Sequence, residues 1–370
     1  MRSHFSPALS RAKLRPLMAL ALITFASVAS AQSSLTVFGV VDASVVRGTG
    51  SVFNKTQLFS GGLLGSRIGF RGVEDLGGGM AARVVFEGAI GADSGAGVPT
   101  STNNQVGAPS PASGITFNRM SWVSLSSNWG ELRLGRDYTP TFAAQAFHDP
   151  DSVGSGIWAP QSAVGSLAVL PNPAGVRASN SIGYLLPSLG GFSGRFMYAM
   201  GENASNSGAT RKDGQLLGGL IGYSAGALTL NAAIEKIRQD AVGDITESVL
   251  GANYDFKMVK VWAQYLHDRT GLAGKMSGHS LAVTMPVDLL ELRGAWSRSK
   301  VTNAAGAAAG TANKLAVAAI YNLSKRTAVY STLAHVRNKD GAASVPIPGV
   351  AGTAANQKSS AVELGLKHSF

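Results

Sequence analysis

The chain has 370 residues, among them 46 Gly and no Cys, and its formal net charge is +11. Beyond the N-terminal segment no stretch approaches the ~20 consecutive apolar residues that a helix needs to span a bilayer, which excludes a helical membrane protein. The basic residues are scattered singly rather than gathered in runs, so the sequence disfavours a nucleic-acid partner and favours an anion-attracting surface.

Residues 1–31 have the organisation of a secretory signal peptide. A basic region, an apolar core and an A-x-A cleavage site follow one another at residues 11–15, 17–28 and 29–31. The apolar core is too short to span a bilayer comfortably, so we expect cleavage before Gln32 and a mature barrel of residues 32–370; an uncleaved anchor is the alternative. Cleavage removes four Arg and Lys residues and no acid, which leaves a net charge of +7.

Polar and apolar residues alternate along many short segments from Leu35 onward. Val84 and Phe86, for example, alternate with Arg83 and Glu87. A period of two places such residues on opposite faces of a β-strand. Counted between turn residues, the segments predict about sixteen strands. The expected spans are 35–47, 64–74, 80–91, 115–126, 131–137, 178–187, 191–201, 214–224, 227–239, 245–255, 258–269, 276–285, 288–300, 313–323, 326–338 and 358–370.

The connections between these segments alternate in length. Tight turns at residues 75–78 and 188–191 are followed by Gly-, Ala- and Ser-rich loops at 91–114 and 203–213. Short turns at one end and long loops at the other are typical of an outer-membrane barrel. We therefore expect an all-β fold, an antiparallel transmembrane β-barrel of roughly 16 strands, whose size leaves an aqueous channel.

A closed barrel requires the first and last strands of the chain to pair with each other. In hydrocarbon every backbone N–H and C=O needs a partner, so residues 360–370 must pair with residues 35–47. Four apolar residues of the last segment fall on one face: Val362, Leu364, Leu366 and Phe370. We expect this pattern to be the assembly signal that the outer-membrane insertion machinery reads.

Several stretches together carry a family likeness. They are SLTVFGVVD at 34–42, GSRIGFRGVEDLGGG at 65–79, FNR at 117–119, WVSL at 122–125, GELRLGRDYTP at 130–140 and GLKHSF at 365–370. In this order they resemble the general diffusion porins of Gram-negative bacteria, particularly those of β-proteobacterial type. The resemblance implies a homotrimer in the outer membrane, passive diffusion of small hydrophilic solutes and ions, and a long third loop folded into each barrel.

The resemblance also implies a channel constriction, in which basic residues of the wall face acidic residues of the third loop, here residues 137–176. By position, its residues are Arg67, Arg119, Arg177, Asp149 and Asp151. Alternation places further charged residues on the lumen wall, namely Arg71, Arg83, Glu87 and Arg133. An excess of Arg over acids favours anions. The alternative for each Arg is a solvated lumen residue or a wall salt bridge.

No grouping with catalytic or metal-binding spacing appears in the sequence. The six His residues are dispersed, and neither H-E-x-x-H nor G-x-S-x-G occurs. We therefore expect no enzyme activity, no metal and no other cofactor. An outer-membrane barrel enzyme and a soluble secreted β-protein, such as a lectin, remain the alternatives. Only a membrane barrel would require detergent for extraction.

The expected partners follow from the same interpretation. They are two further copies of the chain, outer-membrane lipid and lipopolysaccharide, the insertion machinery, and small hydrophilic or anionic solutes, but no nucleic acid. Near the strand ends we expect aromatic side chains on the apolar face, at the membrane interfaces. These are Trp122, Tyr184, Tyr198 and Trp296.

Overall fold

The computed structural model describes residues 33–106, 114–150, 156, 158 and 174–370. The expected signal peptide and Asp151 lie outside the described residues. Among the described residues, no helix is both long and apolar enough to cross a membrane. The elements are β1 (Ser34–Thr49), β2 (Phe53–Ser60), β3 (Arg67–Gly77), β4 (Met80–Ala89), β5 (Met120–Ser127), β6 (Gly130–Tyr138), α2 (Pro140–Phe147), β7 (Arg177–Leu185), β8 (Phe192–Ala199), η1 (Gly208–Lys212), β9 (Leu216–Ala225), β10 (Leu228–Ile237), β11 (Ile245–Asp255), β12 (Lys260–Thr270), β13 (Gly274–Val287), β14 (Leu290–Thr302), β15 (Ala308–Asn322), β16 (Thr327–Lys339), β17 (Ala351–Gly352) and β18 (Lys358–Ser369).

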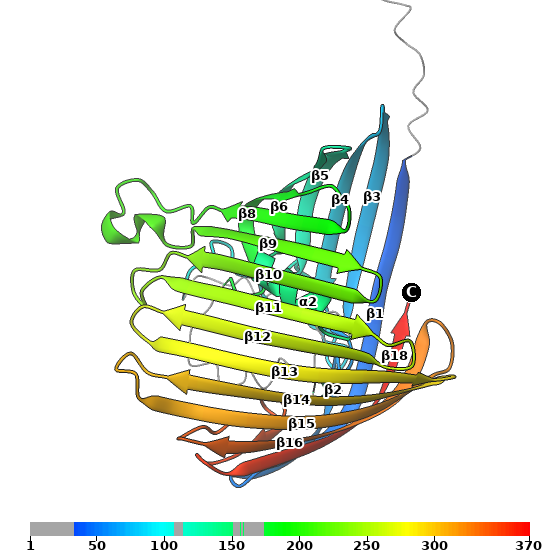
Figure 1. The fold of residues 1–370 in the computed structure, drawn as a ribbon, viewed down its shortest axis with the longest axis vertical. Helices are drawn as coiled ribbons and strands as arrows, with labels where there is room; N and C mark the ends of the chain where they lie inside the picture. The colour runs from blue at the N-terminus through cyan, green and yellow to red at the C-terminus, as the bar shows by residue number, and fades with distance from the viewer. Residues whose placement is uncertain (1–32, 107–113, 151–155, 157, 159–173) are drawn as a thin grey trace, which may run out of the picture.

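The strands pair in one antiparallel sheet that closes on itself (Figure 1). From β3 to β16 each strand pairs with the next along the chain, β16 then pairs with β18, and β18 pairs with β1. The closing ladder runs from Val40 opposite Ser369 to Thr49 opposite Ser360. This confirms that the last segment pairs with the first, so the backbone groups of both terminal strands are satisfied, as hydrocarbon requires.

Sixteen strands form the wall, as predicted. β2 and β3 pair with the same edge of β1, β2 along Ala43–Gly48 and β3 along Ser34–Val40, so the two form one barrel strand with an interruption at residues 61–66. β17 is a two-residue ladder against β2, in the loop before β18. The expected spans omit β2 because its sequence, FNKTQLFS, alternates poorly between polar and apolar residues.

The interruption bends into the barrel and is held by Asp42 of β1. The backbone N–H groups of Leu63 and Leu64 each donate to the Asp42 carboxylate at 2.8 Å, and the Tyr330 hydroxyl donates to it at 2.6 Å. These three donors compensate the desolvation of a fully buried carboxylate. A Cβ atom on Gly62 would lie 2.0 Å from the Tyr330 hydroxyl, so the close approach of the two segments requires Gly.

The two faces of the wall differ as the alternation predicts. Outward positions carry exposed apolar side chains, such as Val41, Ile221 and Leu364. Inward positions carry buried polar or small side chains. From β13 to β18 many of these are Ala, and they pack with three larger side chains from the loops, namely Trp158, Ile347 and Val350. Loop side chains therefore fill one sector of the lumen.

The position of Trp122 is a correction to the expected aromatic residues. Tyr198 and Trp296 are exposed on the outer face, whereas Trp122 is only 7% exposed. The Arg133 guanidinium lies 4.3 Å from the Trp122 ring centroid, inside the barrel. The expectation was wrong because alternation was counted from Arg119, and regular pairing of β5 starts only at Met120.

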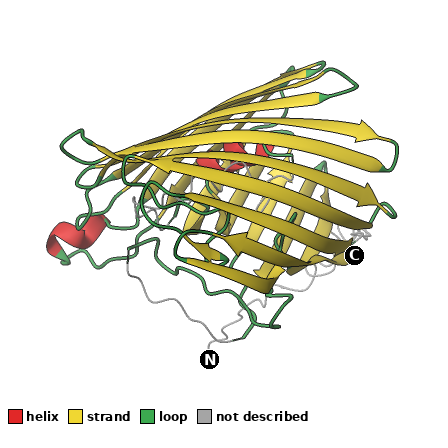
Figure 2. Cartoon of the chain, turned by 90° about the horizontal axis from the view of Figure 1, so that it is seen from below, coloured by secondary structure: helices red, strands yellow, loops and turns green. Residues whose placement is uncertain are grey.

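The loop after β6 folds into the barrel, as expected. Its helix α2 packs against the inner face of the wall between β8 and β11 (Figures 1 and 2). Thr139 caps the N-terminus and Pro140 begins the helix, a combination that favours helix initiation. Thr141 and Ala144 are fully buried against the wall.

Candidate functional site

Two arginines flank one carboxylate on the inner wall. Arg67 starts β3, Arg119 directly precedes β5, and Glu87 stands on β4 between them. The Glu87 carboxylate lies 3.6 Å from Arg67 Nε and accepts a hydrogen bond from Arg119 Nε. The Glu87 side chain is 4% exposed, against 21% and 14% for the two arginines. One carboxylate cancels only one of two positive charges, so the group keeps a net positive charge.

A tyrosine hydroxyl extends this group to a third arginine. Tyr138, the last residue of β6, accepts hydrogen bonds from Arg119 Nη2 at 3.0 Å and from Arg177 Nη2 at 3.1 Å. The Arg177 guanidinium also lies 4.6 Å from the Tyr138 ring centroid. The structure thus brings together Arg67, Arg119 and Arg177, which we call the arginine cluster. Because a hydroxyl carries no charge, Arg177 adds a full positive charge to it.

A second charged cluster lies on the same wall around Arg133. Arg133 contacts Glu131 at 2.8 Å and Asp137 at 3.0 Å, and Arg195 of β8 also donates to Asp137. Arg83 of β4 lies 3.9 Å from Glu131. Three arginines therefore share two carboxylates, and this cluster too has an excess of positive charge. Alternation predicts Arg83 and Arg133 on the lumen wall. Glu131, Asp137 and Arg195 were not among the predicted wall residues, although Arg195 alternates with apolar neighbours in β8.

The remaining wall residue of the sequence analysis, Arg71, lies on β3 away from both clusters. Its side chain is exposed, and its guanidinium lies 5.1 Å from the Phe38 ring centroid. Arg71 therefore adds positive charge to the lumen without an acidic partner among the described residues.

The inner wall caps the C-terminal end of α2. The last four carbonyl groups of a helix have no partner within the helix. Here amide side chains from three neighbouring strands, β10, β11 and β12, supply the missing donors. Asn231 donates to Ala144 O at 3.1 Å, Asn253 to Phe147 O at 3.2 Å, and Gln264 to Gln145 O at 3.2 Å and His148 O at 2.6 Å.

Two carboxylates of the wall hold the rest of the helix. Glu235 of β10 accepts from the backbone N–H of Thr141 at 3.1 Å, where the helix dipole also favours a negative charge. Glu247 of β11 accepts from Gln145 Nε2 at 2.8 Å. The position of α2 is therefore set by polar residues that the sequence analysis did not single out. In the sequence they do not stand out, because polar residues occupy many inward positions of the wall.

The residues after α2 are buried against the wall. Burial lowers the pKa of His148 to about 4, so its imidazole is neutral at pH 7 and Nδ1 accepts a hydrogen bond from Asn253 Nδ2 at 3.1 Å. Asp149 is 1% exposed, and its carboxylate interacts electrostatically with the buried side chain of Lys314 on β15.

The acid beside Arg67 and Arg119 is therefore Glu87 of the wall rather than Asp149 of the loop. The sequence pattern could not show this, because α2 turns the chain towards β12 and β15 before Asp149 is reached.

Comparison with known proteins decides the family. A family model described as Gram-negative porin matches residues 18–341. The chain belongs to the Gram-negative porin family. Outer membrane porin protein 32 of Delftia acidovorans is 33% identical to this porin, over 96% of this chain and 99% of its own. An outer membrane porin protein of Bordetella pertussis is 27% identical, with 74% of each chain covered.

A solved structure agrees with the family assignment. An anion-selective porin from Comamonas acidovorans superposes on this porin with a TM-score of 0.79 at 31% identity, covering 92% of this chain and 100% of that one. This porin is therefore an outer-membrane β-barrel that forms a channel for passive diffusion.

The expected assembly signal lies on and after β18. Val362, Leu364 and Leu366 are exposed on the outer face of the porin. Phe370 follows the strand and exchanges two backbone hydrogen bonds of 3.1 Å with Gly39 of β1. A Cβ atom on Gly39 would lie 2.4 Å from the Phe370 ring, so the ring covers Gly39 directly.

Proposed function

We propose that this porin is an anion-preferring diffusion channel. The observation that carries the proposal is the charge balance of the inner wall between β3 and β8. The arginines of its two clusters are Arg67, Arg83, Arg119, Arg133, Arg177 and Arg195, and the carboxylates are Glu87, Glu131 and Asp137. Such a basic wall concentrates anions and repels cations. The likeness to a solved anion-selective porin supports the same preference.

We assign the channel constriction to the arginine cluster and α2. Arg177 links the cluster to the helix. Its guanidinium lies 4.6 Å from the ring centroid of Tyr138 and 5.9 Å from the ring centroid of Phe142 in α2. Glu87 and Tyr138 hold the guanidinium groups in place, so no side chain has to reorganise when an anion arrives. The Arg133 cluster offers a further weak site on the same wall, and several weak sites in series let an ion enter and leave.

Tracer exchange tests the proposal. Proteoliposomes that contain the porin, with equal salt on both sides, should exchange radioactive chloride severalfold faster than radioactive rubidium, because the wall attracts one ion and repels the other. Exchange under symmetrical salt moves no net charge, so neither flux limits the other. Equal rates, or faster rubidium exchange, would contradict an anion preference.

We infer that the channel has no catalytic role and needs no cofactor. The inner clusters pair guanidinium groups with carboxylates and a phenol, an arrangement that holds fixed positive charge rather than activating a nucleophile beside a general base. Hydrolysis of phospholipid or peptide by the purified porin would count against this inference.

The mature porin is expected to begin at Gln32 and to form a trimer that dissociates on heating in mild detergent. The A-x-A site before Gln32 supports the first part. Membership of the Gram-negative porin family supports the second part. Intact-mass measurement and gel mobility before and after boiling check both. A mass that retains residues 1–31, or a strictly monomeric species, would contradict this expectation.

Phe370→Asp should lower the outer-membrane level of the porin severalfold and leave unassembled chains in the periplasm. The substitution places a charge where the Phe370 ring now covers Gly39 at the barrel closure. Phe370→Tyr keeps the ring and serves as the matched control, which should assemble normally. Immunoblots of separated membrane fractions measure both variants. Normal outer-membrane levels of the Asp variant would remove the argument that the chain end directs assembly.

A further inference from the structure

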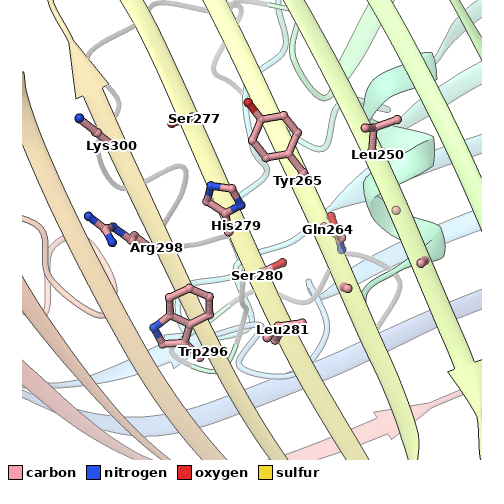
Figure 3. Close-up of a pocket in the computed structure, with 13 residues that line it drawn as sticks. Leu250, Gln264, Tyr265, Ser277, His279, Ser280, Leu281, Trp296, Arg298 and Lys300 are labelled. Atoms are coloured by element: carbon pink, nitrogen blue, oxygen red, sulfur yellow. The ribbon is translucent and has the colours of Figure 1, made fainter.

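A hollow inside the barrel opens to the channel beside α2. It has a volume of about 510 Å³ and lies between α2 and the ends of β8 to β12 that carry short turns. This volume is within the ~300–1,000 Å³ range of small-molecule sites. Because short turns face the periplasm, a solute that enters from outside reaches this inner pocket after it has passed α2. By contrast, the hollow in Figure 3 lies on the outer face of the wall and is lined by Tyr265, His279 and Trp296, so solutes in the channel do not reach it.

Lys260, the first residue of β12, supplies a cation to the inner pocket. Among the residues that the structure describes, no acid forms an ion pair with it. Asp255 lies opposite Lys260 in the strand register, but its carboxylate accepts a hydrogen bond from the Lys257 backbone N–H at 2.7 Å in the turn. Asp149 also lines the pocket, but it is 1% exposed and interacts with Lys314. The charge of Lys260 therefore remains for a solute.

Aromatic rings line the inner pocket around this cation. The Lys260 ammonium lies 4.1 Å from the ring centroid of Trp262. Phe147, the last residue of α2, lines the pocket from the helix, and 54% of its surface is exposed. Tyr138 lines the pocket too, and its hydroxyl accepts a hydrogen bond from Arg119 of the arginine cluster. A half-exposed Phe ring in an aqueous channel gains free energy when an apolar ligand covers it, so these rings favour a flat apolar group.

Most of the polar groups that line the pocket already have partners within the protein. The buried amides of Asn231 and Asn253 donate to carbonyl groups at the end of α2. The Ser224 hydroxyl donates to the Thr229 hydroxyl at 3.3 Å. A sugar needs hydrogen-bonding partners for several hydroxyl groups, because buried polar groups without a partner cost free energy. A free cation beside exposed rings instead suits a ligand with one negative charge and one apolar ring.

We propose that the inner pocket binds aromatic carboxylates on their way through the channel. The carboxylate lies at the Lys260 ammonium, and the ring packs on Phe147 and Trp262. The arginine cluster attracts such an acid, and the inner pocket then holds it at a second weak site further along the channel. The inference rests on the proposed anion preference and adds to it a class of solute that the pore retains.

Block of the chloride current by benzoate tests the proposal in planar bilayers at ~0.1 M potassium chloride, where screening is weak. Benzoate should halve the current of the wild-type porin at a concentration roughly threefold to tenfold below that of acetate, which has the charge without the ring. Benzyl alcohol, which has the ring without the charge, should also require a higher concentration than benzoate.

Substitutions in the pocket separate the two parts of the site. Lys260→Gln should raise the half-blocking concentration of benzoate roughly fivefold, the upper range for a partly exposed charge pair, and leave that of benzyl alcohol unchanged. Phe147→Ala should raise the benzoate value roughly threefold to tenfold, and the docking of α2 should persist because it uses the Phe147 carbonyl. Asp255→Asn removes the acid opposite Lys260, keeps an acceptor for the turn, and should lower the value. The matched control is Lys325→Gln, which removes an exposed cation from another short turn and should change nothing.

Several outcomes would overturn the assignment. Equal block by benzoate and acetate would show that the rings add nothing, and equal block by benzoate and benzyl alcohol would show that the charge adds nothing. Unchanged block in the Lys260 variant, or an equal loss in the Lys325 control, would place benzoate elsewhere in the channel. Each of these results can occur while chloride stays more permeant than potassium. Failure of this inference is therefore distinguishable from failure of the anion-channel proposal.

Discussion

Replacement of both Arg67 and Arg119 by Ala is expected to lower the anion preference of the channel severalfold. The buried Glu87 carboxylate lies between the two guanidinium groups and would remain alone. The arginine cluster and Glu87 together then lose their net positive charge, because Arg177 alone balances the carboxylate. A charge pair at about 4 Å is worth about 1–4 kcal/mol between the dielectric limits of water and a protein surface, which is at least a severalfold change in permeability ratio. Reversal potentials in a salt gradient measure it, and conductance should rise because two large side chains are lost.

Three control variants sharpen this prediction. Arg67→Lys with Arg119→Lys keeps both charges and should retain an anion preference. Adding Glu87→Gln to the Ala pair removes the orphaned carboxylate and should restore part of that preference. Arg47→Ala removes one charge from the outer face and should have no effect. Unchanged selectivity in the Ala pair would show that the constriction lies elsewhere.

The second large effect is expected from Gln264→Leu. The Gln264 amide donates to the carbonyl groups of Gln145 and His148 at the end of α2, and both would be left buried without this donor. An orphaned buried polar group costs about 1–3 kcal/mol, so the docked position of the loop should lose about 2–6 kcal/mol. Since ~1.4 kcal/mol is a factor of ten, the undocked population should rise at least about thirtyfold. Single-channel records should then show added open-channel noise and a larger conductance level.

Asn322→Leu is the matched control for the Gln264 variant. Asn322 also donates its amide to a backbone carbonyl, that of Leu289, but at a turn of the barrel remote from α2. This variant should have wild-type noise and conductance. If the Gln264 variant showed the same open-channel noise and conductance as the control, the amide side chains of β10 to β12 would not hold the loop in place.

The fold could be predicted largely from the sequence because a barrel wall is built from local rules. A period of two fixes which side chains face outward, and alternating loop lengths fix the order of the hairpins. β2 was not predicted because polar and apolar residues alternate poorly along Phe53–Ser60. Its strand conformation depends instead on backbone pairing with β1. Trp122 was misplaced because a single irregular residue before β5 inverts every later side chain of a strand.

The candidate site could be predicted only in part. The family resemblance predicted three arginines of the constriction, namely Arg67, Arg119 and Arg177. The structure joins them through Glu87 and Tyr138. The anchors of the loop could not be found in this way. Asn231, Asn253 and Gln264 acquire their role from the register of three strands against one helix, and no local pattern encodes that contact.

The zero-current potential of the wild-type channel in a potassium chloride gradient tests the central claim most directly. The inner wall between β3 and β8 carries more guanidinium groups than carboxylates, so chloride should be the more permeant ion. The preference should weaken as the salt concentration rises, because the Debye length falls from about 10 Å at ~0.1 M to about 3 Å at ~1 M. A potential of the opposite sign, with potassium the more permeant ion at low salt, would contradict the assignment of the arginine cluster to the constriction.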